Sequence, residues 1–131
     1  MIIEYQRRTH FPTYTGNARF RVDDEGGVFA QVNREEPPLN REWCADYPAA
    51  PTATLSNPRA TIDAILTRHE FFSMEPRTVD DEYDGGYWEQ LTYWNAEGAA
   101  REVLVDRAQV PAFRALVNAL TSSLELLDLH V

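Results

Sequence analysis

The stretch "ARFRVDDEGGVFAQVNRE" (residues 18–35) has apolar and polar side chains in alternation on both sides of a glycine pair. Every second residue is apolar from Ala18 to Val22 and again from Val28 to Val32. A period of two is typical of a strand with one buried face. The intervening "DDEGG" supplies the glycines that a tight turn needs. The sequence therefore predicts a β-hairpin over residues 18–35.

The same alternation predicts further strands at the N-terminus, over "YWEQLTYW" (residues 87–94) and over "REVLVDR" (residues 101–107). Residues 79–86 are predicted to form a second hairpin turn that leads into the strand at 87–94. With two helices, this gives an α+β fold: an antiparallel sheet of about five to six strands with two helices packed on one face. We expect a single domain over residues 1–131.

Both predicted helices begin at a proline, which suits a first helical position. The first follows a cap at Ser56 or Asn57, and apolar residues recur along it at helical spacing. The second follows Asp106 and Gln109, which resemble a capping box. The helical stripes consist of Ile62, Ile65, Leu66 and His69 in the first helix and Phe113, Leu116, Val117, Leu120, Leu124 and Leu127 in the second.

A weak internal echo relates "VDDEGGVFAQVNRE" (residues 22–35) to "VDDEYDGGYWEQLTYWNAE" (residues 79–97). Each copy is followed, after an intervening segment, by a helix that begins at a proline. A duplicated hairpin-plus-helix unit would explain this pattern. Chance repetition of turn residues is the alternative explanation.

Composition restricts the function. The chain has 131 residues, 44% of them hydrophobic and 25% charged, and a net charge of -9. All of its basic residues are arginine and none forms a basic cluster, which argues against nucleic-acid binding. No apolar run is long enough for a membrane span, and "MIIEYQRRTH" does not resemble a secretion signal. We expect a cytoplasmic protein that binds neither nucleic acid nor membrane.

The acidic stretch before the strand at 87–94 matches half of a calcium loop. Asp80, Glu82, Asp84 and Gly85 have the expected spacing, but Leu91 stands where the bidentate glutamate should be. A solvated turn is the simpler interpretation. No metal site and no cofactor are predicted.

Catalytic groups are equally sparse. Cys44 is the single cysteine, and His10 or His69 would have to reach it to form a thiol pair. His130 lies in a C-terminal tail. No catalytic residue is predicted, and the sequence favours a non-catalytic protein over an enzyme.

Aromatic residues are the remaining candidates for function. The alternation places Trp88 and Trp94 on one face of their strand, and large aromatics beside arginines are common in protein interfaces. A proline-rich loop, residues 36–57, either leaves this face bare or folds across it. The predicted binding residues are Trp43, Tyr47, Trp88, Trp94, Arg19 and Arg21.

The segments "ILTRHEFFSM" and "REVLVDRAQVPAFRALVNALTSSL", with the strands between them, resemble the emfourin family over roughly residues 60–120. "IIEYQRR" is similar to the first strand of that family. Emfourins are small bacterial inhibitors of protealysin and related thermolysin-like metalloproteases. The resemblance implies a non-catalytic protein that presents a loop to a protein partner. The glycine pair expected after the first strand is missing from "RTHFPTYTGN".

We therefore expect a non-catalytic protein-binding module, such as a protease inhibitor or an immunity-type partner, that acts through the proline-rich loop and the aromatic strand. Two alternatives remain open. One is a small enzyme or ligand-binding domain with a pocket between sheet and loop. The other is a structural homodimer that self-associates through its aromatic faces.

Overall fold

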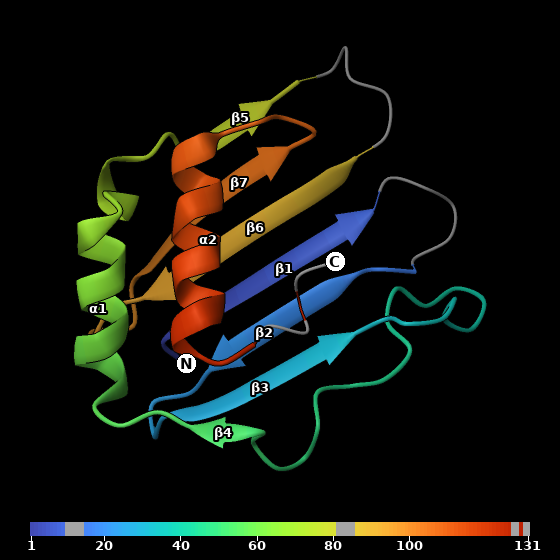
Figure 1. Ribbon diagram of the computed structural model, residues 1–131, viewed down its shortest axis with the longest axis horizontal. Coiled ribbons are helices and arrows are strands. Elements are labelled where there is room, and N and C mark those ends of the chain that lie inside the picture. Colours follow the sequence, from blue (N-terminus) through green and yellow to red (C-terminus); the bar gives the residue numbers. More distant parts are fainter. Residues whose placement is uncertain (10–14, 81–85, 127–128, 130–131) are drawn as a thin grey trace.

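The computed structural model describes residues 1–9, 15–80, 86–126 and 129. Their elements form one mixed sheet of seven strands and two α-helices (Figure 1). In chain order these are β1 (Ile3–Thr9), β2 (Ala18–Val22), β3 (Gly27–Val32), β4 (Ala53–Thr54), α1 (Pro58–Arg68), a short 3-10 helix (Phe71–Ser73), β5 (Arg77–Val79), β6 (Tyr87–Trp94), β7 (Ala100–Asp106) and α2 (Pro111–Ser123).

The strand order is β4-β3-β2-β1-β6-β7-β5, which places β1 at the centre of the sheet. The predicted hairpin over residues 18–35 is confirmed, because β2 and β3 pair antiparallel with Val22 opposite Val28. The predicted α+β class with two helices is also confirmed. The sheet gains two short strands, β4 and β5, whose two and three residues are too short to show a period.

The predicted second hairpin at residues 79–86 is wrong. β5 does not pair with β6 but runs parallel to β7, with Thr78 opposite Val105. The antiparallel partner of β6 along the chain is β7, and the turn between them at "NAEG" (residues 95–98), which the sequence also predicts, is confirmed. Consequently Val22 and Asp23 belong to the first hairpin, whereas Val79 and Asp80 come before the second, and the two copies are not structurally equivalent.

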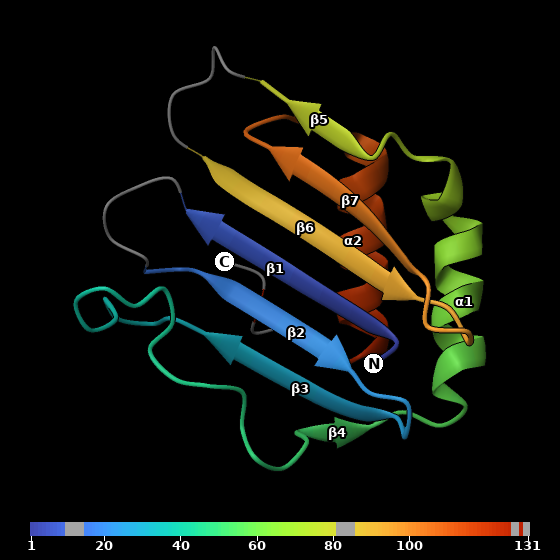
Figure 2. The same cartoon turned by 180° about the vertical axis from the view of Figure 1, so that it is seen from behind.

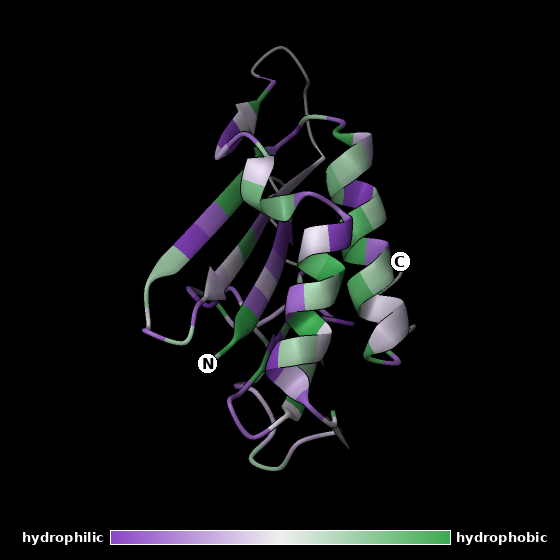
Figure 3. Ribbon diagram, turned by 90° about the vertical axis from the view of Figure 1, so that its left-hand side faces the viewer, coloured by the Kyte–Doolittle hydropathy of each residue, from purple (hydrophilic) through white to green (hydrophobic). Residues whose placement is uncertain are grey.

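Both helices cover the same face of the sheet (Figures 1 and 3). Alternation along β1 and β6 directs buried side chains such as Ile3, Tyr5 and Leu91 toward them. In α2 the predicted stripe is buried from Phe113 to Leu124, and each such leucine contributes about 1.5–3 kcal/mol of burial free energy. The core therefore lies between the helices and one face of the sheet.

The predicted capping box of α2 is wrong. Its N-cap is Val110, and no side chain bonds the first turn. Asp106 instead ends β7 and pairs with Arg107. In α1, Asn57 is the N-cap as expected, but it takes a left-handed backbone conformation and its side chain makes no capping bond.

Some sequence predictions fall on residues outside the described part of the chain: His10, Glu82, Asp84, Gly85, Leu127 and His130. No helix in the described part is long and apolar enough to span a membrane.

Candidate functional site

The face of the sheet opposite the helices, here called the outer face, carries arginines. In β2 the buried residues Ala18, Phe20 and Val22 point toward the helices, so Arg19 and Arg21 point the other way. Arg8 has the same orientation in β1. Seen from behind, no helix covers this face (Figure 2).

Side chains of the proline-rich loop reach over these arginines. The guanidinium carbon of Arg19 lies 4.3 Å from the ring centroid of Trp43 and 4.3 Å from that of Tyr47. Arg21 lies 4.7 Å from the rings of Tyr47 and Phe29. The loop thus covers part of the outer face with two aromatic side chains, each stacked on arginine at cation–π distance.

Arg8 extends the series toward β6. Its guanidinium carbon is 5.1 Å from the ring of Trp88 and 5.9 Å from that of Trp43. We call the resulting row the arginine–aromatic ladder, and its members are Phe29, Arg21, Tyr47, Arg19, Trp43, Arg8 and Trp88.

Five of the six predicted binding residues belong to this ladder. The sixth, Trp94, does not: it lies six residues beyond Trp88 at the other end of β6, about 20 Å away at the usual rise of a strand. Its backbone N–H donates a 2.9 Å hydrogen bond there to the carbonyl of Ile2, the residue before β1. The structure therefore brings five of the six predicted binding residues together and places Trp94 apart from them.

Burial shapes the electrostatics of the ladder. Burial lowers the pKa of Arg19, while the nearby Tyr47 and Glu4 act in the opposite direction. Burial and the charge of Glu4 raise the pKa of Tyr47, whose hydroxyl donates a 3.1 Å hydrogen bond to the Glu4 carboxylate. The Tyr47 hydroxyl therefore stays protonated at neutral pH and can donate to Glu4.

Two buried asparagines anchor the proline-rich loop. Asn33 donates from Nδ2 to the carbonyl of Glu42 at 2.7 Å and accepts from the backbone N–H of Cys44 at 2.9 Å. Asn17 donates to the same carbonyl at 3.1 Å and accepts from the N–H of Thr9 at 2.8 Å. The asparagines are 1% and 0% exposed, so the side-chain partner of each of these bonds is shielded from water.

Leu39 lies at the tip of this anchored segment. Its side chain is 90% exposed, the largest value among the exposed large hydrophobic residues of the described chain. The N–H of Arg41 bonds the carbonyl of Pro38 at 3.1 Å, and Asn40 has a φ of 68°. A positive φ at the third turn position is what a type II turn requires, and asparagine tolerates it.

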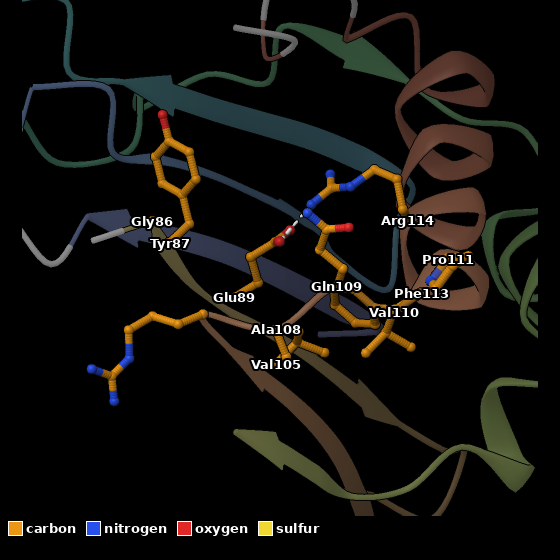
Figure 4. Close-up of a pocket in the computed structure, with 11 residues that line it drawn as sticks. Gly86, Tyr87, Glu89, Val105, Ala108, Gln109, Val110, Pro111, Phe113 and Arg114 are labelled. Carbon is orange, nitrogen blue, oxygen red and sulfur yellow. Dashed lines mark hydrogen bonds and ion pairs between the residues drawn. The ribbon is translucent and has the colours of Figure 1, made fainter. Parts of the chain in front are cut away.

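A pocket of about 450 Å³ lies on the opposite side of the molecule, between β6, β7 and the start of α2 (Figure 4). Its walls combine apolar side chains, among them Val105 and Phe113, with the polar side chains of Glu89, Gln109 and Arg114. In Figure 4 the side chains of Glu89 and Arg114 point toward each other.

Glu89 is the buried charge of this pocket. Its side chain points toward the helices, is 6% exposed, accepts a 2.5 Å hydrogen bond from the Tyr5 hydroxyl and forms an ion pair with Arg114. Burial and Glu89 raise the pKa of Tyr5. Burial acts to lower the pKa of Arg114, but Glu89 and Tyr5 outweigh it and the net direction is upward.

Two of the candidates for a thiol pair, Cys44 and His69, lie in the described part of the chain, and His69 is the C-cap residue of α1. Cys44 lies in the proline-rich loop, where its Sγ donates to the carbonyl of Glu35 at 3.3 Å. The described residues also contain no cluster of three or more histidine, cysteine or acidic side chains placed to hold a metal ion.

Sequence reasoning missed Leu39, the two anchoring asparagines and the partners of Glu89. Leu39 follows two prolines, which is a signal for a presented turn. For Glu89 a signal also existed: the alternation that buries Leu91 and Tyr93 places Glu89 on the same face. Compared with protein-family models, curated proteins and solved structures, the chain matches none of them.

Proposed function

We propose that this chain is a non-catalytic protein-binding module that presents the tip of its proline-rich loop to a partner protein. The observation that carries the proposal is Leu39, 90% exposed at the tip of a loop whose returning arm is held by hydrogen bonds to the buried side chain of Asn33. A single exposed leucine is ordinary on a protein surface. A leucine on a fixed turn is a better anchor, because less conformational entropy is lost on binding.

The anchoring restricts both arms of the loop. On the outgoing arm Pro37 is buried and Glu35 accepts a hydrogen bond from Cys44. On the returning arm Glu42 forms a 2.5 Å ion pair with Arg8. Prolines fix φ in addition, which reduces the freedom that the unbound loop would otherwise lose.

The arginine–aromatic ladder supports the loop and extends the candidate surface. Trp43 packs on Arg19 and Arg8, so the loop is joined to β2 and β1 by stacking as well as by hydrogen bonds. Trp88 lies at the end of the ladder, half-buried. Tryptophan, tyrosine and arginine are the residues most enriched at interface hot spots.

The resemblance to emfourins makes a thermolysin-like metalloprotease the first partner to test. The assay titrates the purified chain against such a protease and follows cleavage of a fluorogenic peptide. A parallel experiment immobilises the chain and identifies stoichiometric partners from a bacterial lysate. Both are repeated with Leu39→Asp, which places a charge at the tip, and with Phe72→Asp as the matched control at another exposed site.

Inhibition or partner capture that Leu39→Asp abolishes and Phe72→Asp preserves supports the proposal. Equal behaviour of the two variants would show that the tip is not the contact. If the wild-type chain neither inhibits the protease nor captures a partner, the proposal is wrong.

A further inference from the structure

We propose that the pocket between β6, β7 and the start of α2 binds a small carboxylate that has an apolar body. This site is separate from the tip of the proline-rich loop and does not depend on the proposed protein partner. Its volume of about 450 Å³ lies within the range of small-molecule sites.

The charge of the site favours an anion. Glu89 and Arg114 form one neutral pair, and Arg107 and Asp106 form a second. Arg7 adds a further positive charge, since it lies opposite Glu89 in the β1–β6 register. Among the described residues, no carboxylate within ion-pair distance balances it.

Arg7 is placed to act on the pocket through Tyr87. Arg7 is 7% exposed, its Nε has no hydrogen-bond partner, and it donates one bond of 3.3 Å to the carbonyl of Gly16. Its guanidinium carbon lies 4.9 Å from the ring of Tyr87, a residue that lines the pocket. A buried cation without a carboxylate of its own attracts a negative ligand across a medium of low dielectric constant.

The start of α2 adds to this preference. The helix begins at Pro111, and Val110, Pro111 and Phe113 all line the pocket. No side chain caps the first turn, so the partial positive charge of the helix N-terminus is not offset there. Arg114 is 46% exposed and has donors beyond those that Glu89 uses, so it can bind a carboxylate with the fork of its guanidinium.

The apolar walls define the rest of the ligand. Val105 and Phe113 form the buried floor at 3% and 1% exposure, and Ala108 and Val110 line the same cavity. Tyr87, 43% exposed, offers an aromatic surface at the rim. A phenyl or short alkyl group would bury its surface here while the carboxylate meets Arg114.

The test uses three probes of one shape: 3-phenylpropionate, its neutral amide and 3-phenylpropylamine. Each is titrated into the full chain, and binding is measured by calorimetry and by chemical shifts in NMR spectra. We expect the carboxylate to bind most tightly. Arg107→Gln should weaken its binding roughly threefold to tenfold, and Glu89→Gln should tighten it by a similar factor, because one removes and the other adds net positive charge.

Arg68→Gln is the matched control, because it makes the same charge change at an exposed position on α1. A selective loss in Arg107→Gln but not in Arg68→Gln supports the site. Tighter binding of the amine, equal binding of all three probes, or no binding up to tens of millimolar would each overturn it. The comparison of the three probes uses the wild-type chain alone, so it tests the proposal even if a variant fails to fold.

Discussion

Asn33 holds the returning arm of the proline-rich loop through a 2.7 Å hydrogen bond from its side-chain amide to the carbonyl of Glu42. The same side chain accepts from the N–H of Cys44, so one buried residue satisfies two backbone groups of the loop. The geometry of the presented turn therefore depends on a residue at the end of β3, outside the loop itself.

Asn33→Ala should lower the free energy of unfolding by about 1–3 kcal/mol, because it leaves the N–H of Cys44 without its partner and removes one of the two hydrogen bonds that the carbonyl of Glu42 accepts. The loop should also open locally, so trypsin should cleave after Arg41 faster than in the wild-type chain. Urea unfolding and limited proteolysis measure the two effects. Asn118→Ala, at an exposed position of α2, should stay within about 0.5 kcal/mol. An unchanged cleavage rate in Asn33→Ala would contradict the anchoring role.

Arg19→Met should cost about 1–2 kcal/mol of unfolding free energy, since it removes the cation between Trp43 and Tyr47 and a 3.1 Å hydrogen bond to the carbonyl of Ala45. Methionine keeps much of the side-chain volume, so the loss reports mainly on charge. Chemical denaturation followed by tryptophan fluorescence measures it. Arg68→Met is the control, and an equal cost in both variants would mean that the stacking contributes nothing.

The alternation of apolar residues predicted most of this fold. The period of two is a local signal, and it correctly predicted strands at the positions of β1, β2, β3, β6 and β7. The pairing of β5 with β7 is not a local property of the sequence. β5 has three residues, too few to show an alternation of apolar and polar side chains. Its partner strand depends on the direction that the chain takes after α1. The acidic and glycine residues at 79–86 therefore predicted a hairpin turn, but the strands on its two sides, β5 and β6, do not pair.

The candidate site was predictable to the extent that it depends on residue type. Arginines and aromatics on one face signalled the ladder, and the loop supplied two of its rings. Its anchors could not be predicted, because Asn17 and Asn33 read as ordinary turn residues until the tertiary structure buries them. Likewise the partners of Glu89 come from β1 and α2, which are distant in sequence.

Tyr5→Phe should show a pH-dependent effect on stability. Burial and Glu89 raise the pKa of Tyr5 above its ordinary value of 10.0, so the folded protein keeps the hydroxyl protonated where the unfolded chain ionises it. The wild-type advantage over Tyr5→Phe, about 1–2 kcal/mol from the hydrogen bond to Glu89, should be constant below pH 10. Above pH 10 it should shrink by up to about 1.4 kcal/mol per pH unit.

Urea unfolding of both proteins between pH 7 and 11 measures this difference, and comparison of the pair cancels the titration of other groups. A difference that grows with pH above 10 would contradict the burial of the Tyr5 hydroxyl. Absorbance at 295 nm provides a second measurement, because the folded wild-type chain should show no more tyrosine ionisation near pH 10 than folded Tyr5→Phe, whereas among the unfolded chains the wild type should show one tyrosine more.

Gly26→Ala tests the placement of β4 against the first hairpin. Gly26 has a φ of 90°, and a Cβ added there would lie 2.2 Å from the carbonyl oxygen of Leu55. Since the N–H of Leu55 also bonds the carbonyl of Gly26 at 2.8 Å, the chain cannot move away without losing that bond. We expect a loss of about 3 kcal/mol or more in unfolding free energy.

Gly98→Ala is the matched control for this substitution. Its φ of 85° imposes a similar backbone strain, but no atom lies within 4 Å of the added Cβ. Strain alone should cost about 1–2 kcal/mol. Thermal or urea unfolding of the two variants therefore separates strain from steric contact, and equal losses would show that Leu55 does not approach Gly26 closely.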